Sequence, residues 1–194
     1  MIISYQAHSY ASDKMEQHIG SNCIDQTVDI SNLLENRLLV IPFFNNHTVW
    51  IYRRNNHQII KADTSKSRTS DSIYASWWSQ DKNPLDFNTS LLNTRSINNE
   101  YFVLYAYSPV GGYYLMYFSE EEDGSEKYDY LDNTWEGGFV DVVNKIAYDF
   151  TGRPIVINIP TTATKVVKEL SKLSLMIPKY DINLKTKTVT LLCK

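Results

Sequence analysis

Three side chains in the first third of the chain are of the types found in a cysteine-nucleophile triad: Cys23, His47 and Asp63. A cysteine attacks an amide or ester carbon as its thiolate, and an adjacent imidazole accepts the proton of the thiol. A carboxylate then orients that imidazole and stabilises its charged form. These residues therefore suit a cysteine nucleophile with its base and orienting group, if the fold brings them together.

The elements expected between Cys23 and His47 would bring these two residues together. Residues 23–36 fit a helix that begins at Cys23 and is capped by Asn22. A helix of about 13 residues advances roughly 20 Å, and a returning strand of about eight residues covers roughly 26 Å. The free N–H groups at the helix start, with Asn22 nearby, are suited to bind a developing oxyanion.

The segment after His47 predicts a hairpin that carries Asp63 back to the histidine. Residues 48–54 and 58–63 have the pattern of strands, and Asn55-Asn56 between them suits a tight turn. In that hairpin Asp63 becomes a near neighbour of His47 on the adjoining strand. Trp50 lies close to the histidine in the sequence and is expected to contact the substrate.

The order of a cysteine at a helix start, a histidine opening a strand and an aspartate closing the next strand resembles the papain-like superfamily. That superfamily, in its broad sense, includes transglutaminase-like and arylamine acetyltransferase-like enzymes. The likeness covers residues 20–64 and is carried by the segment HTVWIYRRNNHQIIKADTS. It implies transfer of an acyl group from Cys23 to water, an amine or another acceptor. The short gap between Cys23 and His47 departs from these families.

The same region also resembles a second group. The segment LLVIPFFNNHTVWIYRRNNHQIIKADTS is similar to the His-to-Asp portion of Ulp-like and YopJ-like cysteine proteases. In those enzymes the nucleophile follows later, in a Cys-Gly pair that opens a helix. The counterpart in this sequence is Gly111-Gly112, which has no thiol. This resemblance implies an inactive relative that binds without cutting.

The pattern along the chain predicts a single α+β domain over residues 1–194, with an antiparallel sheet of hairpins packed against several amphipathic helices. Further strands are expected in LLVIPFF at 38–44, where Pro42 indicates an edge or a bulge, and in YFVLYAY, GYYLMYF, KYDYL, IVINI and a closing hairpin about Lys185-Thr186. Helices are expected over residues 13–19, 71–78 and 139–150 and after Thr162. The polar segment 64–100 is loop-like, and Trp77 and Trp78 within it are further candidates for substrate binding.

Composition limits the possible compartments and partners. The formal charge of −3 and a pI near 5.8 give no broad cationic surface, so no nucleic-acid partner is expected. No window has the roughly 18 apolar residues of a membrane span, and the first residues lack the apolar core of a signal peptide. Two cysteines favour a reducing compartment, with a Cys23–Cys193 bridge left open. The chain is expected in the cytoplasm, or delivered into a host cell without a cleavable signal peptide.

Two functions from different classes follow from these observations. The first is a cysteine hydrolase or acyltransferase, such as a protease, deamidase or transglutaminase-like enzyme, acting on a protein or peptide amide. The alternative is a non-catalytic protein-binding module, such as an immunity protein, an inhibitor or an inactive protease-like effector. No metal or cofactor is expected, because His8, His18 and His57 lack ligand spacing and the glycine pairs lack the context of a dinucleotide loop. Either function implies a protein or peptide partner.

Overall fold

The computed structural model describes residues 23–64, 94–122, 128–131, 135–157, 162–165, 168 and 174–193. Within these residues the fold is mostly β, with three antiparallel sheets and one α-helix of seven or more residues. The first sheet has the order β1 (Gln26–Asp29), β10 (Thr188–Leu191) and β9 (Tyr180–Asn183). The central sheet has the order β2 (Arg37–Phe43), β3 (His47–Arg53) and β4 (Tyr101–Tyr105). The third sheet has the order β5 (Met116–Phe118), β6 (Gly138–Asp141), β7 (Ile146–Tyr148) and β8 (Pro154–Ile157).

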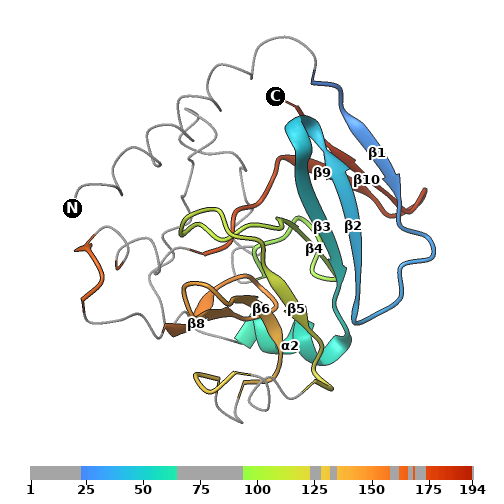
Figure 1. Ribbon diagram of the computed structural model, residues 1–194. Coiled ribbons are helices and arrows are strands. Elements are labelled where there is room, and N and C mark those ends of the chain that lie inside the picture. The colour runs from blue at the N-terminus through green and yellow to red at the C-terminus, as the bar shows by residue number, and fades with distance from the viewer. Residues whose placement is uncertain are drawn as a thin grey trace.

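Two short helical elements join or follow the central strands. The 3-10 helix η1 (Phe44–Asn46) connects β2 to β3, and α2 (Asn56–Thr64) follows β3. Figure 1 shows the first sheet beside the β2–β3 hairpin at the upper right, and the third sheet and α2 below it. The central sheet therefore lies between the other two.

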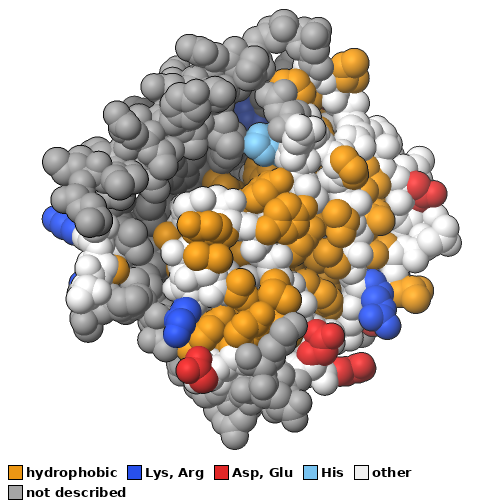
Figure 2. Space-filling model, in the orientation of Figure 1, with side chains coloured by type: hydrophobic (Ala, Val, Ile, Leu, Met, Phe, Trp, Pro, Cys, Tyr) orange, Lys and Arg blue, Asp and Glu red, His pale blue; other side chains and the backbone are white. Residues whose placement is uncertain are grey.

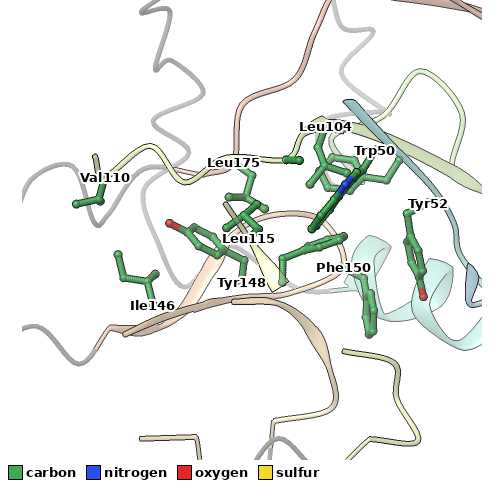
Figure 3. Packing of buried hydrophobic residues seen from close by; sticks show 12 residues of the cluster. Trp50, Tyr52, Leu104, Val110, Leu115, Ile146, Tyr148, Phe150 and Leu175 are labelled. Atoms are coloured by element: carbon green, nitrogen blue, oxygen red, sulfur yellow. The ribbon is translucent and has the colours of Figure 1, made fainter. Parts of the chain in front are cut away.

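Both faces of the central sheet carry apolar side chains. On one face Ile41, Val49 and Ile51 pack with residues of the first sheet, including Val189 and Leu191. The opposite face carries the alternate residues of the same strands, because successive side chains of a strand point to opposite sides. These residues pack with the third sheet in a cluster that contains Trp50, Tyr52, Phe102, Leu104, Phe139, Tyr148 and Phe150. Figure 3 shows side chains of this cluster meeting in the interior.

Several strand predictions are confirmed. The runs at 38–44 and 48–54 form β2 and β3, and the closing hairpin forms β9 and β10. Pro42 lies on β2, which is an edge strand of the central sheet among the described residues. Proline has no N–H to donate to a neighbouring strand, which suits an edge position.

The predicted α+β class with several amphipathic helices is wrong. Residues 139–150, expected as a helix, form the hairpin β6–β7 with a turn between the strands. The Asp141 carboxylate shapes this turn by accepting hydrogen bonds from the N–H groups of Val143 and Asn144, at 3.1 and 2.9 Å. Lys145 has a φ of 55°, which a helix interior excludes. The apolar spacing of this segment is compatible with a helix and with a hairpin, and strand pairing decides for the hairpin.

The helix expected over residues 23–36 is also absent. In its place β1 pairs with β10, and Asp29 then begins a turn by accepting a hydrogen bond from the Ser31 N–H at 2.8 Å. Ile24 and Leu34, two members of the expected apolar stripe, are both exposed. Val28, the third member, packs against the core from a strand, so the three residues do not form one helical face.

The strand expected over residues 58–63 is part of α2. Asn55 caps this helix, since its Oδ1 accepts from the Gln58 N–H at 2.8 Å while Gln58 Oε1 accepts from the Asn55 N–H at 3.2 Å. This reciprocal pair is a capping box. Asn55-Asn56 thus starts a helix instead of turning a hairpin.

The remaining predicted elements have mixed outcomes. Strands β4, β5 and β8 lie at least partly in the runs YFVLYAY, GYYLMYF and IVINI, as predicted. The run KYDYL is not a strand in its described part, residues 128–131. The helices predicted over residues 13–19 and 71–78 lie outside the described residues, and the helix after Thr162 lies mostly outside them.

A buried guanidinium ties the end of the central sheet to two loops. Arg54 is fully buried, and it donates hydrogen bonds to the carbonyl oxygens of Phe150, Asn99 and Thr94 at 3.0, 2.9 and 2.8 Å. A fourth bond goes to Ser96 Oγ at 2.9 Å. Burial lowers the pKa of Arg54 to about 10, so the side chain is still charged at neutral pH.

We expect Arg54→Met to destabilise the protein strongly. The substitution leaves the Phe150 and Asn99 carbonyl oxygens without these donors, and each buried unsatisfied group costs about 1–3 kcal/mol, so the two together cost about 2–6 kcal/mol. Urea unfolding measures the loss. The matched control is Arg37→Met on β2, because Arg37 is exposed. Equal losses in the two variants would contradict the role assigned to Arg54.

Candidate functional site

The residue predicted as the nucleophile is part of a disulfide bond. Cys23 is bonded to Cys193, with the two Cα atoms 5.5 Å apart. Cys23 also lies in a segment without helical structure that leads into β1, so it does not begin a helix as predicted. A disulfide sulfur carries no thiolate, and the thiolate is the attacking species in cysteine catalysis. In this oxidised form the sulfur of Cys23 cannot act as a nucleophile.

The other two members of the predicted triad lie at different ends of β3. His47 is the first residue of this strand, whereas Asp63 lies in α2, which begins after the last residue of the strand. Seven residues of β3 span roughly 20 Å. Figure 1 shows α2 at the end of the central sheet away from the β2–β3 turn. The structure therefore does not bring His47 and Asp63 together.

The supporting residues of the predicted site have two different outcomes. Trp50 is 5% exposed and belongs to the core between the central and third sheets. Asn22, Trp77 and Trp78 lie outside the described residues.

His47 lies against two tyrosine rings at the top of β3. Its ring contacts those of Tyr105 and Tyr107 edge-on, with both centroid distances at 6.1 Å. Burial lowers the pKa of His47 below its ordinary value of 6.5, because an apolar setting disfavours the charged imidazolium. His47 is therefore a neutral, ring-packed side chain at neutral pH.

A row of aromatic rings leads from His47 into the interior. The Tyr107 and Tyr114 rings are 5.0 Å apart, and Tyr114 lies 6.1 Å from Trp50. Trp50 in turn lies 6.1 Å from Phe139, which is fully buried. Tyr114 is 50% exposed, so the row runs from solvent to the core.

The side chains beside Tyr114 form an open apolar surface. Val40 pairs with Trp50 across the β2–β3 ladder, so the two side chains lie on the same face of the sheet. Pro42 lies two residues further along β2, on that face, and both Val40 and Pro42 are exposed. We call Val40, Pro42, Tyr107 and Tyr114 the aromatic face. Figure 2 shows hydrophobic side chains gathered over this part of the molecule.

A glycine turn places Tyr114 over Trp50. Gly111 and Gly112 have φ values of 75° and 68°, which L side chains rarely adopt. The turn is closed by a hydrogen bond from the Ser108 N–H to the Tyr113 carbonyl at 2.8 Å. An isolated bridge then pairs Tyr107 with Tyr114. The sequence signal for this arrangement is the Gly-Gly turn between two tyrosine-rich runs, which does not by itself predict that the tyrosines converge.

The aromatic face has the chemistry of the centre of a protein interface. Residues on this side of the described strands β2, β3 and β4 include no charged side chain; they are Leu38, Val40, Pro42, Thr48, Trp50, Tyr52, Phe102 and Leu104. Interface centres are depleted in charge and enriched in tyrosine and tryptophan. The Nε1 of Trp50 is buried and has no hydrogen-bond partner among the described residues.

Two other kinds of site receive no support. Among the described residues, no group of three or more His, Cys, Asp or Glu side chains is placed to hold a metal ion. In the same part of the chain, no helix is long and apolar enough to cross a membrane.

Comparisons with known proteins do not assign this chain to a family. No protein-family model matches the chain, and no curated protein matches it. The resemblance to papain-like enzymes over residues 20–64 therefore stays a prediction, as does the resemblance to Ulp-like and YopJ-like proteases.

We expect neither cysteine to react with iodoacetamide in the native protein without reductant, because both sulfurs are in the bridge. After reduction in denaturant both should react, as peptide mass spectrometry would show. The His47→Ala variant is the control, and it should give the same result as the natural chain. Fast alkylation of Cys23 near about pH 6 that slows in His47→Ala would instead reveal a paired thiolate.

We expect His47 to make the protein less stable in acid. Its pKa is lowered in the folded state, so the unfolded chain binds the proton more readily. This contribution to stability is complete above the unfolded pKa of about 6.5 and is lost as the pH falls toward the folded pKa. Urea unfolding at about pH 7 and 5 should therefore show a smaller acid loss in His47→Gln.

The exposed histidine His57 provides the control for this measurement, through His57→Gln. The His47 effect would be refuted if the natural chain and His47→Gln lost the same free energy of unfolding on acidification.

Proposed function

We propose that this chain is a non-catalytic protein-binding module that docks a partner protein through the aromatic face. The observation that carries this proposal is the exposure of two side chains beside the buried Trp50. Tyr114 packs against the Trp50 ring, and Val40 is the cross-strand neighbour of Trp50. A rigid tyrosine set on a packed core loses little conformational entropy when a partner covers it.

The rim and shape of the face favour a protein over a small ligand. Small molecules bind in concave pockets that enclose most of their surface. Val40, Pro42 and Tyr114 of the aromatic face are instead exposed, and Figure 2 shows hydrophobic side chains spread broadly over the viewed face of the molecule. Charged side chains lie beyond one end of it, at the start of β2: Arg37, Glu120 and Glu122 all act electrostatically on Tyr117, whose hydroxyl donates to the Asn36 carbonyl at 2.9 Å. An apolar centre with a charged rim is the usual composition of a protein interface.

Catalysis by Cys23 is not part of this proposal. The sulfur is bridged, the expected helix is absent, and Asp63 lies in α2 at the other end of β3 from His47. Of the two functions predicted from the sequence, the binding module is the one that these contacts support.

The bridge also bears on the compartment in which the module works. Disulfides persist in oxidising environments and are rare in the cytosol, where thiols are kept reduced. We therefore propose that the oxidised chain acts outside the reducing cytoplasm, in place of the cytoplasmic location expected from its two cysteines.

A photo-crosslinking experiment tests the binding surface. A benzophenone amino acid is placed at Val40, at Tyr114 or at Leu184, in cells that naturally contain the protein. Leu184, in the turn between β9 and β10, is the matched control because it and Val40 are both 52% exposed. We expect one defined protein adduct from positions 40 and 114 and none from 184.

A second substitution makes this test specific. Adding Tyr114→Asp to the chain labelled at Val40 should abolish the adduct, because a buried unpaired carboxylate costs several kcal/mol at an apolar interface. No adduct at either position, or equal adducts at all three, would rule the aromatic face out as the docking surface.

A further inference from the structure

The Cys23–Cys193 bridge lies at one end of the ladder between β1 and β10. This ladder runs from Gln26, paired with Leu191, to Asp29, paired with Thr188. Cys23 precedes β1 and Cys193 follows β10, so the bridge joins the two strands just beyond their first pair. Beside the bridge, the Cys193 N–H donates a hydrogen bond to Asp25 Oδ1 at 2.9 Å.

The other end of β1 is anchored without the bridge. Ile30 is buried, and its N–H donates to the Lys187 carbonyl at 2.9 Å. Leu33 is also buried, and its carbonyl accepts from Arg53 Nη1 at 2.9 Å. These contacts hold the turn after β1 against the central sheet.

The first half of β1 has much weaker support. Its side chains alternate between half-buried and exposed, and Ile24 before it is exposed. Apart from the ladder, its contacts with β10 include one hydrogen bond between the Thr27 and Thr190 hydroxyls at 3.0 Å. Segments with few buried contacts open locally at low free energy.

We propose that the bridge is a redox-controlled strap: while oxidised it holds β1 on β10, and its reduction frees β1 as far as Ile30. Reduction breaks the bond between the two sulfurs and adds two electrons and two protons, which gives the thiols of Cys23 and Cys193. A small dithiol supplies the electrons and protons through thiol–disulfide exchange and becomes a disulfide itself.

Opening of β1 would expose a short strand edge on β10. In an antiparallel ladder, alternate residues bond to opposite neighbours. The Ile30 N–H bonds to the Lys187 carbonyl, and Val189 and Leu191 are two and four residues further along β10. Their backbone N–H and C=O groups therefore also point toward β1. The N–H and C=O groups of Thr190 point toward β9 instead. Leu192, two residues further along, likewise donates its N–H to the Lys179 carbonyl at 2.9 Å.

The freed N–H and C=O groups of Val189 and Leu191 are the kind of edge to which a further strand adds. This edge belongs to the first sheet, so the inference goes beyond the docking function proposed for the central sheet.

Hydrogen exchange of three neighbouring amides tests the strap. The amide exchange rates of Val189, Leu191 and Thr190 are measured by NMR in the oxidised protein and again with dithiothreitol. We expect Val189 and Leu191 to exchange about tenfold faster or more after reduction, and Thr190 to change much less. The double variant Cys23→Ser/Cys193→Ser should behave as the reduced protein and should not respond to dithiothreitol.

Two results would overturn the strap. Unchanged protection of Val189 and Leu191 after reduction would show that the ladder holds β1 without the bridge. An equal acceleration of all three amides would show that the bridge stabilises the whole protein and does not control one strand. The measurement on the natural chain stands by itself if the double variant fails to fold, and neither result depends on the aromatic face.

Discussion

The buried charge of Arg54 is the constraint on which the arrangement of the sheets depends. A guanidinium removed from water is costly unless its donors are satisfied. Arg54 meets this need with carbonyl oxygens from the 94–99 loop and from Phe150, so the chain must bring those loops to the end of β3. Arg95 does the same nearby, with bonds to the carbonyl oxygens of Thr151, Gly152 and Leu175 at 2.9, 3.1 and 2.7 Å. The central and third sheets are thereby joined through their loops.

This connection between the loops of the central and third sheets determines how much of the central sheet is covered. Near Arg54 the sheet is closed over, since Tyr52 stacks on Phe150 with centroids 5.2 Å apart and an interplanar angle of 13°. Toward the β2–β3 turn, Tyr114 is the side chain that lies over Trp50, and Val40 is left exposed. The aromatic face is thus the part of an apolar sheet surface that the third sheet leaves open.

The two cysteines show why residue types alone did not define the chemistry. Cysteine, histidine and aspartate at these positions suit a triad, and the same Cys23 suits a structural bridge. The choice depends on whether residues 23–36 form a helix or begin with a strand. Pairing of β1 with β10 places Cys23 beside a cysteine 170 positions away, and that pairing is invisible in local sequence.

The sequence by itself determined the long apolar strands β2 and β3, the edge position of Pro42 and the closing hairpin of β9 and β10. These segments have strand composition, and Asn183 before the closing turn accepts hydrogen bonds from the Lys185 and Thr186 N–H groups, so local chemistry favours one structure. Tertiary structure alone decided the other elements. Residues 138–148 and 56–64 carry apolar patterns that suit either a helix or a strand, and Asn55 suits either a turn or a helix cap. In such short segments, non-local pairing and burial outweigh local preference, and they also set the cysteine partner and the exposure of each tyrosine.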